Sequence, residues 1–91
     1  MTNLNKLYTL YDVHSHNKGK VKDLLSNHLP SNYTKKVQDN LLSEGIEISR
    51  QSIRQVKLGT YKNLAVFNEL LEVAIQNKHA RKKLTEILKK A

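Results

Sequence analysis

The chain has 91 residues, the length of one domain with a modest core, so we expect little room for a catalytic cleft beside the fold. It has no cysteine, which excludes a disulfide framework and a cysteine-based zinc finger, and no apolar run of the roughly 18 residues that a membrane span needs. Sixteen Lys and Arg against eight Asp and Glu give a net charge of +8, which attracts polyanions. This charge favours nucleic acid as the target over an anionic membrane or a merely solubilising surface.

Residues 1–18 are the least regular part of the chain. Leu4, Leu7, Tyr8 and Tyr11 recur at helical spacing, but the run from Leu7 to Tyr11 is also compatible with a short strand. The Asn, His and Ser residues that follow dilute any regular element. We expect an irregular, flexible arm over residues 1–18, which could include one turn of helix, and a folded domain over residues 19–91.

The pattern becomes helical from Gly19. The stripe of a first amphipathic helix consists of Val21, Leu24, Leu25 and His28. Pro30 ends this helix, because the residue before a proline is disfavoured in the helical region. Ser31 then offers a hydroxyl to cap a second helix over residues 31–44.

The end of the second helix carries a glycine signal. Gly45 can adopt the left-handed conformation, which places Leu41 and Ile46 where an apolar contact accompanies a Schellman cap. Ser49 offers a cap for a third helix, which Gly59 ends.

The pattern of residues 63–90, the C-terminal third of the chain, predicts either one long helix or two shorter helices separated at Asn77. Asn63 can cap it, and the residues from Leu64 to Ile75 are apolar around much of the circumference, which predicts a helix in the middle of the core. Further along, a stripe continues as Ala80, Leu84, Ile87 and Leu88. This stripe could fold back on the core or form a homodimer contact, and we favour the homodimer.

The combination predicts an all-α domain of four to five helices with a helix-turn-helix at residues 31–58. In such a motif the second helix enters the major groove with its N-terminal residues at the base edges. The segment from Ser49 to Gly59 has the required layout, because polar side chains alternate around Ile53 and Val56. Arg pairs with guanine and Gln with adenine through two hydrogen bonds each.

The segment SRQSIRQVKLGT resembles the recognition helix of Cro/repressor-type helix-turn-helix proteins, which are common in bacteria and their phages. Residues 29–78 are similar to small regulators of this class from Bacteroidetes-type bacteria. By position, the resemblance implies base contacts from Arg50, Gln51 and Arg54. It implies base-edge or backbone contacts from Ser31, Lys35, Ser49, Ser52, Gln55, Lys57, Thr60, Tyr61 and Lys62. The link LLSEGIEIS is longer than the usual turn, which leaves the angle between the two helices open.

No phosphate loop, catalytic carboxylate pair or nucleophile–base arrangement is present, so we expect no enzyme, no cofactor and no small-molecule ligand. His14 and His16 are interpreted as solvated side chains rather than metal ligands. The expected partner is double-stranded DNA, and the expected role is a transcriptional regulator in the cytoplasm, or in the host cytoplasm if the protein comes from a phage. Two alternatives stay open: an assembly protein, for example a phage component that uses the motif as scaffold, and a structured-RNA binder.

Overall fold

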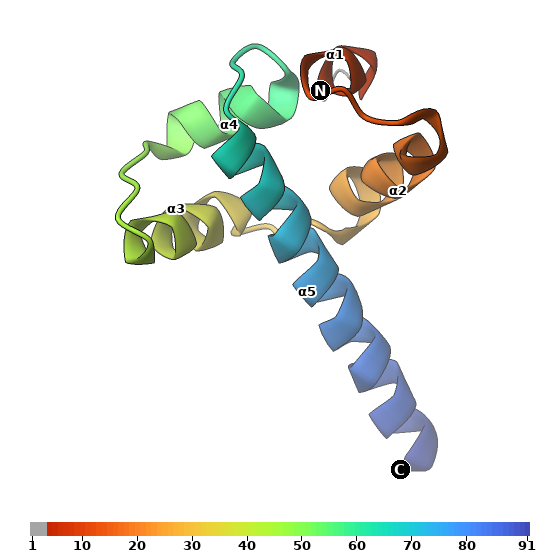
Figure 1. Ribbon diagram of the computed structural model, residues 1–91. Helices are drawn as coiled ribbons and strands as arrows, with labels where there is room; N and C mark the ends of the chain where they lie inside the picture. The colour runs from red at the N-terminus through yellow and green to blue at the C-terminus, as the bar shows by residue number, and fades with distance from the viewer. Residues whose placement is uncertain (1–3) are drawn as a thin grey trace.

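The computed structural model describes residues 4–91, and every regular element in this part of the chain is a helix (Figure 1). The all-α prediction is therefore confirmed. In chain order the elements are α1 (Leu4–Leu10), the 3₁₀ turn η1 (Ser15–Asn17), α2 (Lys18–Asp23), the π-helical turn η2 (Leu24–His28), α3 (Tyr33–Ser43), α4 (Arg50–Leu58) and α5 (Leu64–Lys90).

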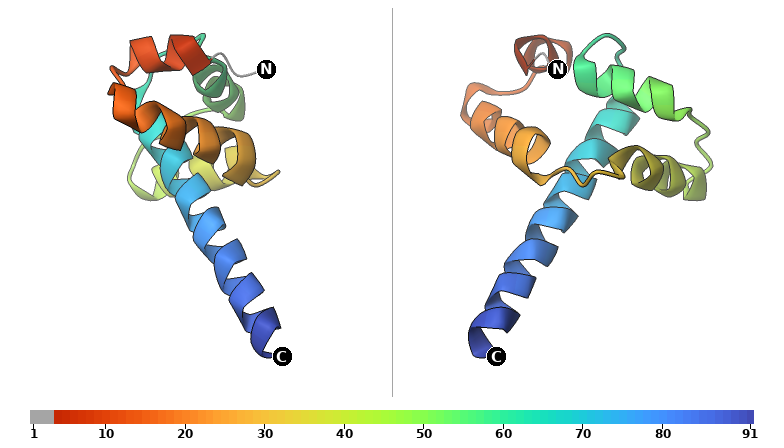
Figure 2. Two further views of the ribbon diagram at one scale, coloured as in Figure 1. Left: turned by 90° about the vertical axis from the view of Figure 1, so that its right-hand side faces the viewer. Right: turned by 180° about the vertical axis from the view of Figure 1, so that it is seen from behind.

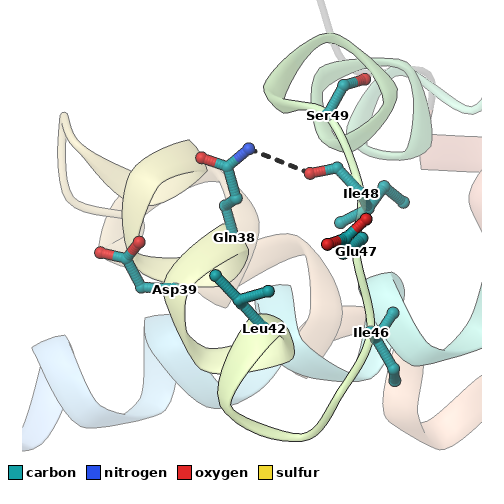
Figure 3. A pocket seen from close by; sticks show the side chains of 7 residues that line it. All are labelled: Gln38, Asp39, Leu42, Ile46, Glu47, Ile48 and Ser49. Atoms are coloured by element: carbon teal, nitrogen blue, oxygen red, sulfur yellow. Dashed lines mark hydrogen bonds between the residues drawn. The ribbon is translucent and has the colours of Figure 1, made fainter.

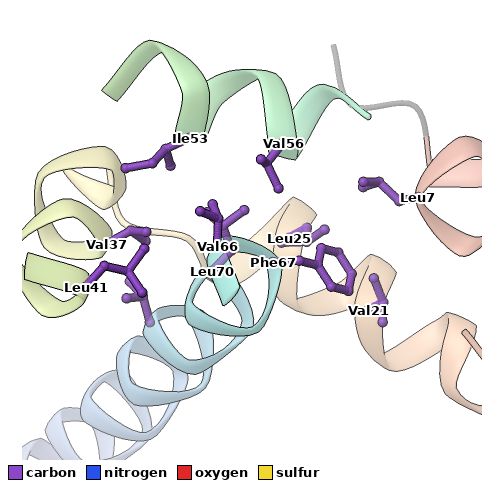
Figure 4. Packing of buried hydrophobic residues seen from close by; sticks show 11 residues of the cluster. Leu7, Val21, Leu25, Val37, Leu41, Ile53, Val56, Val66, Phe67 and Leu70 are labelled. Atoms are coloured by element: carbon purple, nitrogen blue, oxygen red, sulfur yellow. The ribbon is translucent and has the colours of Figure 1, made fainter. Parts of the chain in front are cut away.

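The N-terminal half of α5 forms the centre of the fold, as its apolar circumference predicts. Figure 1 shows α2 on one side of this helix and α3 on the other, with α4 near its N-terminal end. Side chains from all of these helices meet on α5 (Figure 4). The buried apolar residues are Leu7, Val21, Leu25, Val37, Leu41, Ile53, Val56, Val66, Phe67, Leu70, Val73 and Ala74.

The N-terminal segment differs from the expected irregular, flexible arm. Its described part, from Leu4 onward, forms α1 and joins the core, whereas residues 1–3 lie outside the described range. Leu7 is 0% exposed, and the ring of Tyr11 stacks on Phe67 of α5. The helical spacing of Leu4, Leu7 and Tyr11 therefore marks a face that packs on the domain, while the short-strand alternative is wrong.

The expected cap at Ser31 is also wrong. The structure has Asn32 at the N-cap of α3, without a side-chain hydrogen bond, and Ser31 is exposed. The backbone closes this turn instead, since the amide of Tyr33 donates to the carbonyl of Pro30 at 3.1 Å. The N-cap of this helix consequently lies one residue later than predicted.

The other predicted helix ends are confirmed. Gly45 has φ = 82°, and the amide of Ile46 donates to the Leu41 carbonyl at 2.9 Å, the long hydrogen bond of a Schellman cap. Ser49 Oγ accepts from the Ser52 amide at 3.1 Å, and Asn63 Oδ1 accepts from the Val66 amide at 3.2 Å. Gly59, with φ = 84°, ends α4.

The last helix is one continuous element of 27 residues, so Asn77 does not divide it. Its side-chain amide donates instead to the His28 carbonyl of η2 at 2.7 Å, which ties this turn to α5. Beyond this point α5 projects away from the other helices, and residues 78–91 are all exposed (Figure 2). The alternative in which this segment folds back on the core is therefore wrong. None of the described helices is both long and apolar enough to cross a membrane.

Candidate nucleic-acid interface

Helix α4 has one buried face and one polar face. Ile53 and Val56 are both 0% exposed and point from α4 into the core (Figure 4). At about 100° per residue, Gln51 and Arg54 lie opposite these two residues. The exposed residues on the polar side are Arg50, Gln51, Arg54 and Gln55, while Ser52 and Lys57 are half-buried at its edges. The structure thus brings the three predicted base-contact residues to one exposed surface.

The start of α4 is fixed by its cap. The Ser49 side chain accepts from the Ser52 amide, and its hydroxyl lies 2.9 Å from that of Ser52. Both hydroxyls are thus held by the helix terminus. Since the cap sets where the helix begins, it also places Arg50 and Gln51 in the first turn.

Gln38 of α3 connects the two helices at this end, a role that the sequence analysis did not assign to it. Its amide nitrogen donates to the Ile48 carbonyl in the link at 3.0 Å (Figure 3), and its amide oxygen accepts from Arg50 Nε at 3.1 Å. One side chain therefore holds both the link and the guanidinium of Arg50. The only signal in the sequence was a polar residue next to the apolar Val37, and this pattern is too common to single out Gln38.

A second contact joins the opposite ends of the pair. Lys57 Nζ lies 5.3 Å from the centre of the Tyr33 ring, within the range of a cation–π interaction. Burial raises the pKa of the Tyr33 hydroxyl above its usual 10.0, and the charge of Arg54 nearby lowers it in part. Tyr33 therefore stays neutral at physiological pH and keeps Lys57 next to the start of α3.

The remaining predicted contact residues lie around this helix pair. Lys35 is on the exposed face of α3, where its ammonium is 3.9 Å from the carboxylate of Asp39. Thr60 closes the C-terminus of α4 by donating from its hydroxyl to the Gln55 carbonyl at 3.2 Å. Tyr61 and Lys62 follow it as exposed side chains in the link to α5.

An open hollow of about 460 Å³ lies beside the link between α3 and α4 (Figure 3). It is lined by Gln38, Asp39, Leu42, Ile46, Glu47, Ile48 and Ser49. The carboxylates of Asp39 and Glu47 make this side of the pair less attractive to phosphate than the side with Arg54 and Lys57. The electrostatics therefore favour contact through the outer face of α4 rather than through the link.

Charge is distributed unevenly along the chain. Residues 31–62 carry six Lys and Arg against three acidic residues, a net +3. Residues 78–91 also carry six, but against Glu86 alone, a net +5. Most of the bulk positive charge therefore lies on the projecting part of α5 and not on the helix pair.

His14 and His16 lie close together, with their ring centres 4.5 Å apart. Both are exposed, and no group of three or more metal-binding side chains is found among residues 4–91.

Comparison with protein families, with curated proteins and with solved structures found no match to this chain. The resemblance to Cro/repressor-type proteins therefore rests on the residues quoted above.

Proposed function

We propose that this protein binds duplex DNA by inserting the outer face of α4 into the major groove, and that it acts as a sequence-specific transcriptional regulator in the cytoplasm. The observation that carries the proposal is the division of α4 into two faces. The side chains of Ile53 and Val56 are fully buried and fix the helix to the core. Gln51 and Arg54 lie at the centre of its exposed side. A helix that reads base edges needs both a fixed orientation and free hydrogen-bonding groups.

Two cross-helix contacts support this use of α4. Gln38 holds the Nε of Arg50 and leaves the outer guanidinium nitrogens available, and Tyr33 holds the ammonium of Lys57. Side chains that are ordered before binding lose less conformational entropy when they meet DNA. Arg54 and Gln51 would then choose bases, with Arg50 at the edge of the groove.

Phosphate contacts would come from the residues around α4. Lys35 on α3 and Lys62 in the link after α4 are exposed cations, and the hydroxyl of Tyr61 is on the same link. Such contacts supply affinity that falls with salt and carry no direct sequence information. Glu47 and Asp39 oppose this attraction beside the hollow, and Asp39 partly neutralises Lys35, so the phosphate contact from Lys62 would be the stronger of the two.

Selection of bound duplexes from a random library at about 150 mM salt tests the proposal. An enriched sequence motif is the expected result. Recovery of DNA without a motif would contradict sequence-specific regulation. If no DNA is retained, the proposed DNA interface itself is excluded.

Alanine variants on α4 test whether this helix recognises the bases. Arg54→Ala and Gln51→Ala should each lower the preference for the selected sequence about 5- to 100-fold, as expected for the loss of a two-bond base contact. Lys22→Ala is the matched control for the charge change, because Lys22 is an exposed cation on α2. Unchanged preference in both α4 variants would exclude this helix from base recognition.

A further inference from the structure

The projecting part of α5 carries an apolar stripe that lies in line with the core. At about 100° per residue, Ala80, Leu84, Ile87, Leu88 and Ala91 fall within an arc of about 100°. The same arc contains Val66, Leu70 and Val73, which the other helices bury. Outside the domain the stripe is uncovered, since Leu84, Ile87 and Leu88 are 55%, 53% and 64% exposed. The surface that builds the core thus continues for about 20 Å without a partner.

The shape of the molecule restricts what can cover this stripe. Helix α3 packs on the same side of α5 directly above it, as the 2.8 Å hydrogen bond from Asn40 of α3 to Glu69 of α5 shows. A flat surface such as a membrane cannot lie along the stripe, because α3 projects from that side. A narrow rod can occupy the corner between α3 and the projecting helix (Figure 2). A second helix, with axes about 8 to 10 Å apart, has the required width.

We propose that this rod is the projecting helix of a second copy, paired antiparallel. A parallel pair would bring the two copies of α3 against each other at the upper end of the stripe, because α3 packs on that side of α5 beside Glu69. In the antiparallel pair the turn at Leu88 of each copy lies below α3 of the other, and Leu84 of each chain packs near Ile87 of the other. The stripe is self-complementary under this twofold rotation, as a closed homodimer contact requires.

The charges of the projecting helix make this dimer weak and salt-sensitive. Lys78, Lys82, Lys89 and Lys90 lie on the back of the helix, about 120 to 160° from Leu84, and do not face the partner. Arg81 and Lys83 flank the stripe, about 60° and 100° from Leu84, and meet their counterparts in the second copy. Their repulsion opposes pairing at low salt. Association therefore strengthens as salt screens these cations, which is the opposite of the salt dependence of DNA binding.

The arrangement has a consequence that rests on the proposed function. Helix α4 packs near the N-terminal end of α5, about 28 Å along the axis from the middle of the stripe. The two copies of α4 therefore lie roughly 55 to 60 Å apart at opposite ends of the dimer. This separation is too large for two half-sites one helical turn apart, which are about 34 Å from centre to centre. The dimer would bridge two DNA segments instead.

Sedimentation equilibrium of the full chain without DNA tests the pairing. We expect a dissociation constant on the order of 10 to 500 µM in about 1 M salt, and at least threefold weaker association in about 0.1 M salt, where the Debye length is about 10 Å. The double variant Leu84→Gln/Ile87→Gln should weaken association at least tenfold. Leu64→Gln is the matched control, because Leu64 is 57% exposed on the same helix but lies outside the stripe. Circular dichroism checks that each variant is folded.

A chain that stays monomeric at about 1 mM in 1 M salt would overturn the proposal, as would equal effects of the stripe and Leu64 variants. The direction of pairing is read from one spin label at Asn68→Cys, since the chain has no cysteine of its own. Antiparallel pairing predicts a distance of about 50 Å between labels, and a distance below about 30 Å would contradict it. Because DNA is absent from these measurements, their failure leaves the DNA-binding proposal standing. If the protein does not bind DNA, conversely, only the inference that the dimer bridges two DNA segments is lost.

Discussion

The ring of Tyr11 lies flat against the ring of Phe67, with the ring centres 4.0 Å apart and the two planes inclined by 2°. The Tyr11 hydroxyl also accepts from the amide of Asn63 at 2.9 Å, the residue that caps α5. One side chain after α1 thus contacts both the core and the start of the central helix. This relationship makes the N-terminal segment part of the folded unit.

Tyr11→Ala should therefore lower the free energy of unfolding by about 2 to 4 kcal/mol, because it removes an aromatic contact and leaves space beside Phe67. Urea denaturation followed by circular dichroism measures the change. Thr9→Ala, at an exposed position on α1, is the control and should stay within about 0.5 kcal/mol. A loss below about 1 kcal/mol for Tyr11→Ala would mean that α1 does not unfold together with the core.

The pH dependence of stability should also report Tyr11. Its pKa is raised above the usual 10.0, mainly by burial, and the pKa of Tyr33 is raised for the same reason. A raised pKa in the folded state means that the contribution to stability is complete below pH 10 and is lost as the pH rises through the folded-state pKa. Tyr11→Phe should reduce the alkaline loss of stability above about pH 10. Thermal unfolding between about pH 8 and pH 11 checks this, with Tyr8→Phe as the control because the Tyr8 hydroxyl contacts the Lys18 carbonyl instead, and equal slopes in both variants would contradict it.

Gly45 and Gly19 offer a matched pair for backbone conformation. A Cβ at either position would meet no atom within 4 Å, so packing does not enter the comparison. Gly45 has φ = 82°, and Gly45→Ala should destabilise the protein by about 1 to 2 kcal/mol because L residues are strained there. Gly19 lies within α2, and Gly19→Ala should stabilise by about 0.5 to 1 kcal/mol. Chemical denaturation of both variants gives the two signs, and a neutral Gly45→Ala would show that the Schellman turn can rearrange.

Gln38→Ala tests whether α3 positions α4 for base recognition. Loss of its hydrogen bonds to Arg50 and to the Ile48 carbonyl should cost about 1 to 2 kcal/mol of stability. If α4 recognises DNA bases, the preference for the base that Arg50 contacts should fall about 3- to 10-fold. The affinity for an unrelated duplex should stay within about twofold. Binding to the selected duplex and to an unrelated duplex separates the two effects. Gln76→Ala, at an exposed site on α5, is the control, and an unchanged preference in Gln38→Ala would leave the Gln38–Arg50 contact with a structural role only.

The sequence by itself determined the features that depend on neighbours along the chain. The all-α class follows from the helical period of the apolar residues, and the caps at Ser49 and Asn63 follow from side chains three residues before the amides that they accept from. The turn at Gly45 was predictable because its hydrogen bonds also stay within a few residues. Among the predicted helix caps, local chemistry failed at Ser31, where a backbone hydrogen bond from Tyr33 to Pro30 closes the turn.

Only the tertiary structure decided the features that depend on distant residues. Leu4, Leu7 and Tyr11 were ambiguous between helix, strand and arm until the contact with Phe67, 56 positions after Tyr11, selected the helix. The contact between Gln38 and Arg50 needed the observed angle between α3 and α4, which the long link left open. The projection of α5 was equally hidden, because the stripe has the same period whether or not a helix covers it. Periodicity records which face of a helix is apolar, and only the three-dimensional packing determines what that face contacts.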